Sequence, residues 1–246
     1  PVKGVIIANE VLDAFPFERL VYHQNTLCRQ GVEIIEDDST YKIQYSELPL
    51  SNEINDSLLE ANNTIGLKIP PDGVQEGWST EWHIEVKSWL TNAFASLELG
   101  NMLIIDYALN SSRYYINSRH SGTALAYKNQ SAINNIIADG GLVDITAHLC
   151  VELLEYQAKL CGWNYIGNTS QGEALLSLGL AQKIHSLREL KENELNIAIA
   201  KRESLLALVD PLGLGQFRWF AFSADNNDQT NYLATTLCKF LEEPII

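Results

Sequence analysis

The sequence predicts an α/β fold, and three features of its pattern carry this prediction. A short, continuous apolar run at residues 5–8 is followed at once by Asn9 and Glu10, as in a buried strand that ends in polar residues. Apolar residues recur at helical spacing over residues 81–99, and Gly100 follows where a glycine often ends a helix. A second buried strand over 102–107 then ends in the acid Asp106. A helix, a glycine, a buried strand and a terminal acid in this order are typical of α/β proteins.

The remaining elements are expected from the same kinds of pattern. Apolar and polar residues alternate over 17–45, which predicts hairpin-like strands with a turn near 37–39. The other expected elements are a short helix with loops over 46–75, loops over 108–141, a helix over 146–160, a strand over 163–167, helical stretches from 174 to about 180 and over 187–209, a strand over 217–222 and a turn at 225–228.

Length and composition describe one large domain with an acidic surface. The 246 residues are expected to form a single α/β domain, with insertions at 17–75 and 108–165. The net charge of −14 disfavours an extended surface for nucleic acid or anionic membranes, and it is compatible with a basic partner. A hydrophobic content of 46% argues against disorder, and no apolar run is long enough to predict a membrane span.

The sequence lacks the motifs of several common metal-binding, nucleotide-binding and hydrolase sites. The four cysteines form no CxxC pair and are expected to be reduced thiols. The five histidines lack metal-binding spacing, so no metal site is predicted. There is no GxxxxGK[ST] loop and no GxSxG elbow, and the glycines at 213 and 215 precede a strand instead of following one.

Polar clusters next to apolar segments are the candidates for chemistry, and each also has a structural interpretation. Asn9, Glu10 and Asp13 can bind a ligand or accept a proton, or else Asn9 and Asp13 can cap the next helix. Thr80 can cap the helix expected from Glu81, whose carboxylate then favours the first turn.

Three further clusters have the same ambiguity. Asp106 and Tyr107 form a strand end or a simple turn, Asp144 is a candidate helix cap with Thr146 and His148 after it, and Gln171 and Gly172 open a helix. If the sheet is parallel, the clusters converge on one of its edges, where α/β sheets bind ligands. The residues alone therefore predict a ligand-binding domain with an acidic site, and no particular reaction.

The ordered clusters resemble one protein family. Residues 4–16, which read Gly-Val-Ile-Ile-Ala-Asn-Glu-Val-Leu-Asp-Ala-Phe-Pro, are similar to the NExxDAxP segment of the MidA-like methyltransferases, the relatives of the mitochondrial arginine methyltransferase that assists complex I assembly. The resemblance continues to about residue 222, through Glu76-Gly77 with Glu81 and Trp89, 103–107, Gly122-Thr123 with Tyr127, 144–148, 170–172 and 210–213. Two departures are Gln130 in place of a histidine and Gly140-Gly141 in place of Pro-Gly.

This resemblance implies a class I, Rossmann-like methyltransferase sheet that binds S-adenosylmethionine (SAM). The strand at Val5 resembles the fourth strand of that sheet, and no glycine-rich cofactor loop precedes it. The chain is therefore expected to be the carboxyl-terminal part of a larger enzyme, with the sheet incomplete at its N-terminal side and the main SAM loop outside this chain.

The resemblance also implies roles for individual residues. Glu10, Asp13 and Glu81 are the expected catalytic acids, and Asn9 and Glu10 are expected to contact the cofactor. The expected substrate-binding residues are Asp106, Tyr107, Asp144, Thr146, His148, Gln171 and Gly172.

The implied activity is methylation of a protein arginine, with a subunit of a respiratory complex I-type enzyme as the substrate. A homodimer and a cytoplasmic location, or the mitochondrial matrix in a eukaryote, are further expectations. A non-catalytic assembly module and an inactive fragment of the same fold are the alternatives.

Overall fold

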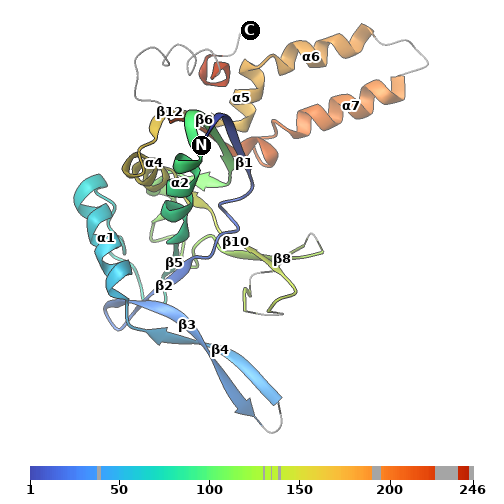
Figure 1. Ribbon diagram of the computed structural model, residues 1–246. Coiled ribbons are helices and arrows are strands. Elements are labelled where there is room, and N and C mark those ends of the chain that lie inside the picture. Colours follow the sequence, from blue (N-terminus) through green and yellow to red (C-terminus); the bar gives the residue numbers. More distant parts are fainter. Residues whose placement is uncertain are drawn as a thin grey trace. The chain divides into compact units, whose positions relative to one another are not determined.

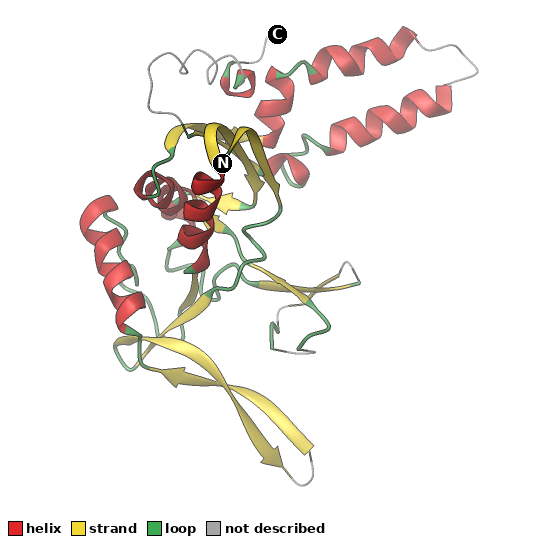
Figure 2. Cartoon of the chain, in the orientation of Figure 1, coloured by secondary structure: helices red, strands yellow, loops and turns green. Residues whose placement is uncertain are grey.

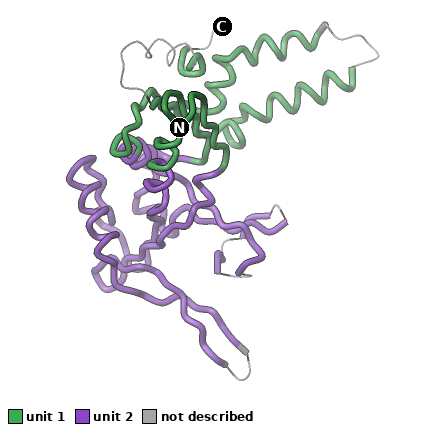
Figure 3. Tube along the Cα trace, in the orientation of Figure 1, with its two compact units in different colours: residues 1–10, 91–107, 158–246 green, residues 11–90, 108–157 purple. Residues whose placement is uncertain are grey.

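The computed structural model describes residues 1–37, 40–129, 131–133, 135–137, 140–189, 195–224 and 238–243. The chain divides into two compact units (Figure 3). Unit 1 comprises residues 1–10, 91–107 and 158–246, and unit 2 comprises residues 11–90 and 108–157. The expected insertion at 17–75 lies within the first segment of unit 2, and the expected insertion at 108–165 overlaps the second. The turns expected at 37–39 and 225–228 fall largely or wholly outside the described residues.

Unit 1 is built on a mixed sheet of four strands (Figure 1). Its order is β1 (Val2–Asn9), β6 (Leu97–Asp106), β13 (Arg218–Ser223) and β12 (Asn164–Ser170). β1 and β6 are parallel, and β13 runs antiparallel to both β6 and β12. The carboxyl ends of β1, β6 and β12 therefore lie at the same edge of the sheet, as the sequence pattern predicts for its polar strand ends.

Two glycines allow β1 and β6 to approach closely. Gly4 is the direct partner of Gly100 in the parallel ladder. A Cβ on Gly100 would lie 1.9 Å from the main-chain oxygen of Gly4. The interpretation of Gly100 as the end of a helix is therefore wrong, because this residue lies inside β6 and is needed for strand contact.

The helices of unit 1 follow or precede these strands. α2 (Glu85–Ser96) and α4 (Val151–Leu160) cross the boundary between the units, and α5 (Gln171–Ser177), α6 (Leu180–Ser186) and α7 (Leu195–Ala207) lie in unit 1. The short 3₁₀ turns are η1 (Leu187–Glu189), η3 (Leu214–Gln216) and η4 (Lys239–Leu241). Ala174, Ala221 and Phe240 form a buried core with Cys238, against which Trp219 packs.

Unit 2 contains an antiparallel sheet whose two longest strands form an extended hairpin (Figure 2). The sheet order is β4 (Thr40–Leu48), β3 (Thr26–Asp37), β2 (Glu18–His23) and β5 (Ser79–Trp82). Leu20 and Trp82 project from one face into a core with Ile54 and Leu58 of α1 (Asn52–Ile65). Because side chains alternate along a strand, Arg19 and Glu81 occupy the opposite face.

Short elements complete unit 2. They are β7 (Ala108–Leu109) paired with β11 (Leu149–Cys150), α3 (Ser111–Tyr114), and a small sheet of β10 (Asp144–Thr146), β8 (Leu125–Lys128) and β9 (Ser131–Ile133).

No helix in the described ranges is long and apolar enough to cross a membrane. None of the four cysteines forms a disulfide, as the sequence predicts.

Two expected helices begin later than their apolar spacing predicts. Thr80 and Glu81 lie in β5, and the helix begins at Glu85, so Thr80 is not its cap. Asp144 lies in β10, and α4 begins only at Val151. In both places a short strand pairs with a distant segment before the helix begins, and the local sequence contains no sign of that partner.

Candidate functional site

The carboxyl edge of the unit 1 sheet brings together polar residues from two parallel strands. Asn9 is paired with Ile105, and the main-chain N–H of Glu10 donates to the Ile105 oxygen at 2.9 Å. The ends of β1 and β6 are therefore level, and Asn9 and Glu10 lie beside Asp106. Ligands of α/β sheets bind at such strand ends.

Glu10 presents an exposed carboxylate at this edge. Its φ of 51° is in the left-handed region, which is uncommon for a residue with a side chain. Asn9 is also exposed, and its amide nitrogen lies 3.4 Å from Glu10 Oε1. The two side chains can thus offer a ligand one carboxylate and one amide, although they also contact each other.

Asp106 has a different environment from Glu10. Its side chain is fully buried, and Oδ1 accepts a hydrogen bond from the Tyr107 N–H at 2.8 Å. The Tyr107 ring packs on Phe217, with 4.0 Å between the ring centroids. These contacts stabilise the turn after β6, and they leave Glu10 as the exposed acid at the ends of the two strands.

Gln171 and Gly172 lie where β12 meets α5, at the same edge of the sheet. Ser170 caps α5 in a reciprocal capping box with Glu173. The Gln171 amide nitrogen donates to the main-chain oxygens of Leu208 and Leu214, and its oxygen accepts from the Trp219 indole. The amide group of Gln171 therefore holds the segment before β13 in place.

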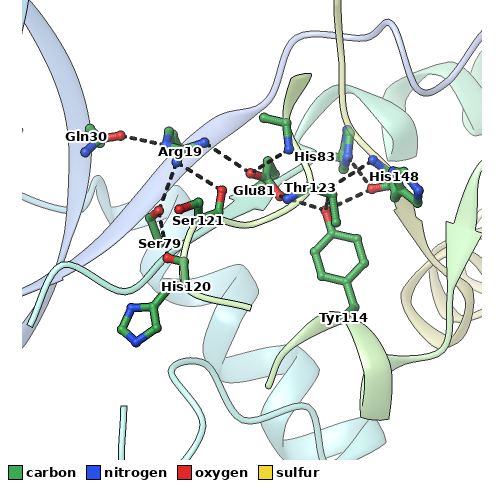
Figure 4. A network of polar contacts seen from close by, with 11 residues as sticks. Arg19, Gln30, Ser79, Glu81, His83, Tyr114, His120, Ser121, Thr123 and His148 are labelled. Atoms are coloured by element: carbon green, nitrogen blue, oxygen red, sulfur yellow. Dashed lines mark hydrogen bonds and ion pairs between the residues drawn. The ribbon is translucent and has the colours of Figure 1, made fainter. Parts of the chain in front are cut away.

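Unit 2 contains a second polar cluster, centred on the buried carboxylate of Glu81 (Figure 4). Glu81 on β5 is the cross-strand partner of Arg19 on β2, and Arg19 Nη1 lies 3.3 Å from Glu81 Oε1. The Glu81 side chain is 0% exposed and that of Arg19 is 15% exposed. Burial of a carboxylate is costly unless a cation and hydrogen-bond donors compensate for it.

The loop after α3 supplies those donors. The N–H groups of Thr123 and Ala124 lie 2.9 and 3.2 Å from the two Glu81 oxygens, and the Thr123 hydroxyl is 3.0 Å from Oε2. Gly122 makes this approach possible, since its φ is 69° and a Cβ there would lie 2.1 Å from Glu81 Oε1. The position requires glycine on both grounds.

Hydroxyl groups extend the cluster toward His148. The Tyr114 hydroxyl lies 3.1 Å from Glu81 Oε2 and 2.9 Å from the His148 main-chain oxygen. Burial, with a smaller contribution from the charge on Glu81, raises the pKa of Tyr114 well above its usual value, so its hydroxyl remains a donor. The Thr123 hydroxyl accepts from the His148 N–H at 3.0 Å.

His83 is a buried, neutral histidine attached to the same segment. Its Nε2 lies 3.0 Å from the His148 main-chain oxygen, so this nitrogen carries the proton, and Nδ1 has no hydrogen-bond partner among the described residues. Burial lowers the pKa of His83 to about 4, and burial together with Arg119 and His83 lowers the pKa of His148 to about 4.

Replacement of His83 should change how stability depends on pH. The folded pKa of about 4 lies below the ordinary histidine pKa of 6.5, so the unfolded chain binds a proton first as the pH falls. His83 therefore makes the free energy of unfolding fall by about 1.4 kcal/mol per pH unit between the two pKa values. Urea titrations from pH 7 to pH 4.5 should show a shallower decline in His83→Gln. The exposed residue His185 provides the matched control, His185→Gln, and equal slopes in all three proteins would contradict the prediction.

A cavity of about 880 Å³ lies beside the Glu81 cluster, within unit 2. Arg19, Arg119 and His148 line it, together with Thr123. Its remaining lining residues are Ile43, Gln44, Tyr45, Ser121, Gly122, Ala124, Leu125, Asn135 and Ile137. None of these described lining residues is Asp or Glu.

The structure distributes the expected site residues over both units. Asn9, Glu10, Asp106, Tyr107, Gln171 and Gly172 meet at the sheet edge of unit 1, whereas Asp13, Glu81, Asp144, Thr146 and His148 lie in unit 2.

Three of the residues in unit 2 have clearly different surroundings. Asp13 is buried, and its main-chain oxygen accepts from the Ala147 N–H at 2.9 Å. Asp144 is exposed and pairs with Tyr127 between β10 and β8. Glu81 is enclosed by donors, which favours a structural role for its carboxylate over direct contact with a substrate.

Sequence reasoning missed the partners of Glu81. The alternation over 17–45 predicts only that Arg19 lies in a strand, and no motif of the sequence contains Tyr114 or His83. One signal is present, since Glu81 lies between two large aromatic residues, Trp78 and Trp82, and an acid that is buried with them needs a cation or hydrogen-bond donors. Nothing in the sequence indicates that the cation is Arg19. Within the described part of the chain, no group of three or more metal-ligating side chains is found.

The fold and the position of the site define the class of protein. A parallel β1–β6 pair continues through antiparallel β13 to β12, with acids at the carboxyl edge, which is a class I methyltransferase arrangement. A family model described as "Putative S-adenosyl-L-methionine-dependent methyltransferase" matches residues 1–169. The chain belongs to this family.

Two solved structures from Burkholderia thailandensis are similar to the chain. One is a COG1565 superfamily member bound to S-adenosyl-homocysteine, and the other is a native structure of an uncharacterized protein of that superfamily. Each aligns with a TM-score of 0.77 and 26% identity over 99% of this chain. The match covers 57% and 59% of those proteins, so the chain spans less than two thirds of either. No curated protein sequence matches the chain.

Proposed function

We propose that the chain is the carboxyl-terminal part of a SAM-dependent methyltransferase that modifies an arginine in a protein. The observation that carries this proposal is the exposed carboxylate of Glu10 beside Asn9, at the carboxyl edge of a methyltransferase sheet. The family match and the S-adenosyl-homocysteine bound to the similar Burkholderia protein support SAM as the cofactor.

The residues at this edge fit such a cofactor and such an acceptor. SAM supplies a methyl group bonded to a positively charged sulfur, together with hydroxyl and ammonium groups that a carboxylate or amide can bind. Asn9 and Glu10 offer those acceptors. An arginine guanidinium is permanently charged and planar, and carboxylates can orient it by charge-assisted hydrogen bonds. Glu10 can therefore hold the acceptor nitrogen in line with the methyl group, which is the main contribution that orientation makes to catalysis.

The free edge of β1 supports placing the chain in a larger sheet. Within the described residues β1 pairs only with β6, and Val2, Val5 and Ile7 are 64%, 58% and 67% exposed. An unpaired strand with exposed apolar side chains favours association with another strand. We infer that further strands of the complete enzyme pair with β1, and that they contribute the remainder of the SAM site.

The finer features of the proposal derive from the resemblance to MidA-like enzymes. They are an acceptor in a respiratory complex I-type subunit, a location in the bacterial cytoplasm or the mitochondrial matrix, and a homodimeric enzyme. The net charge of −14 supports a basic acceptor segment.

Titration calorimetry with SAM tests the cofactor assignment. The chain and a version that includes the preceding residues of the native protein should be compared, and we expect the longer version to bind SAM. If neither protein binds SAM, the enzyme proposal fails, and a non-catalytic assembly role becomes the better interpretation.

Replacement of Glu10 tests the acceptor assignment. In the complete enzyme, Glu10→Gln should lower kcat/KM for transfer of a labelled methyl group about 100-fold, because an amide cannot neutralise the guanidinium. Stability should change little, since Glu10 is exposed. Glu98→Gln is the control, because Glu98 is an exposed acid on β6 that contacts Lys3 at 3.5 Å. Equal rates for the two variants would reject the role of Glu10.

A further inference from the structure

The β3–β4 hairpin of unit 2 has one exposed apolar face. The register pairs Val32 with Tyr45, Ile34 with Ile43, and Glu36 with Tyr41, and these pairs point to the same side of the hairpin. Of the apolar side chains on this face, Ile34 is 69% exposed and Tyr41 is 74% exposed. The opposite face is more polar and carries Glu33, Ile35, Lys42, Gln44 and Ser46.

This apolar face continues into the cavity beside the Glu81 cluster. Arg19 donates to Gln30 of β3 at 2.6 Å, and alternation along β3 places Gln30 on the same side as Val32 and Ile34. Ile43 and Tyr45 belong to both the apolar face and the cavity lining. The hairpin face and the cavity therefore form one surface, apolar along the hairpin and cationic at its base.

Arg119 gives this surface an uncompensated positive charge. The other arginine of the cavity, Arg19, is neutralised by Glu81. Arg119 Nε donates to the Arg113 main-chain oxygen at 3.1 Å, and no carboxylate of the described residues lies within ion-pair distance of Arg119. Such a cationic site, in a chain whose net charge is −14, is complementary to a carboxylate.

The strand at the edge of the sheet favours an extended polypeptide over a small acid. β4 is a terminal strand of the unit 2 sheet, and among the described residues it pairs only with β3. Main-chain groups at its outer edge can pair with an added strand, whose alternate side chains would then contact Tyr41, Ile43 and Tyr45 of β4 on the apolar face. A small carboxylate would use the cationic cavity and leave this face uncovered.

We propose that this surface binds an extended, acidic segment of a partner polypeptide, with a carboxylate at Arg119 and apolar side chains against Tyr41, Ile43 and Tyr45 of β4. Glu36 lies on the same face, at the end of the hairpin away from Arg119. Its negative charge repels an acidic residue, so the acidic end of the segment is expected at Arg119 and the other end near Glu36. The inference goes beyond the proposed function, because this binding requires neither SAM nor methyl transfer.

Fluorescence anisotropy with three labelled peptides tests the inference directly. The probe is acetyl-Ile-Thr-Val-Thr-Ile-Thr-Asp-amide, in which alternation places the three aliphatic side chains and the carboxylate on one side. The neutral peptide carries Asn in place of Asp, and the polar peptide carries Ser in place of the aliphatic residues. The native protein should bind the probe about tenfold more tightly than the neutral peptide at low salt, and binding of the polar peptide should be weaker still.

Matched variants separate the two parts of the surface. Arg119→Gln should remove the preference for the acidic probe, Arg119→Lys should retain much of it, and Arg113→Gln should leave it intact, because Arg113 does not line the cavity. Ile43→Ser should weaken binding of the probe and of the neutral peptide several-fold, whereas Ile35→Ser, on the opposite face, should not.

Circular dichroism before each titration confirms that a variant is folded. Equal binding of the acidic and neutral peptides by the native protein would overturn the inference, and so would equal effects of Arg119→Gln and Arg113→Gln. Failure to bind any of the peptides would also overturn it. None of these outcomes bears on SAM binding, so the methyltransferase proposal is tested separately.

Discussion

Replacement of Glu81 by alanine should lower the free energy of unfolding by about 3–5 kcal/mol, because it leaves a buried cation without its partner. The Arg19 side chain is 15% exposed, and its Nη1 lies 3.3 Å from Glu81 Oε1. The alanine variant also removes the acceptor for the N–H groups of Thr123 and Ala124, which lie in a buried loop. Each such donor left without a partner adds to the loss.

Urea denaturation at pH 7 measures this effect, and a second ion pair in the same sheet provides the control. Glu18 lies 3.4 Å from Arg29, with side chains that are 28% and 30% exposed. Glu18→Ala should lower the free energy of unfolding by less than about 1 kcal/mol, since water solvates much of a partly exposed ion pair. Losses of similar size in the two variants would show that the Glu81 cluster contributes no more than an ordinary surface pair. Glu81→Gln should lie between the two, because it keeps one carbonyl acceptor and loses the charge.

Replacement of Gly100 by alanine should destabilise the sheet of unit 1 by about 3 kcal/mol or more, the upper range for inserting atoms into a packed site. The added Cβ would lie 1.9 Å from the Gly4 main-chain oxygen. Main chain, unlike a flexible side chain, cannot rotate away, so the parallel β1–β6 pair must separate locally.

Hydrogen exchange of the β1 amides, together with denaturation, should detect this separation. Gly4→Ala is the matched control, because a Cβ on Gly4 would meet nothing within 4 Å. That variant should be neutral or slightly stabilising, since glycine is unfavourable inside a strand. Equal loss in both variants would mean that β1 and β6 do not approach as closely as the structure indicates.

The parts of the fold that could be predicted are those with a strong local pattern. The apolar runs at 5–8, 102–107 and 217–222 lie in β1, β6 and β13, as predicted. The prediction that the first of them is buried is wrong for the described residues, because Val5 and Ile7 of β1 are 58% and 67% exposed. The expected convergence of polar strand ends holds for Glu10, Asp106 and Gln171, since β1, β6 and β12 run in the same direction.

The Glu81 cluster could not be predicted because it depends on register between distant segments. The four residues of β5 are all buried and too few to show alternation. The apolar residues that follow them have helical spacing, so the sequence pattern predicts a helix from Glu81 instead of a strand. Arg19 reaches Glu81 through a cross-strand pair of residues 62 positions apart, and nothing local specifies that pairing. Gly122 shows the same limitation, since its need for a positive φ is visible only once the carboxylate beside it is known.

The strand order of unit 1 has a consequence for synthesis on the ribosome. β6 lies between β1, which precedes it, and β13, which follows more than a hundred residues later. At roughly 5–20 residues per second, the β13 edge of β6 stays open for several seconds or longer while the chain emerges. Such non-local pairing is slow to form, and an open apolar edge invites association with other chains. Production of this protein should therefore be sensitive to the rate of translation and to chaperones that shield unpaired strands.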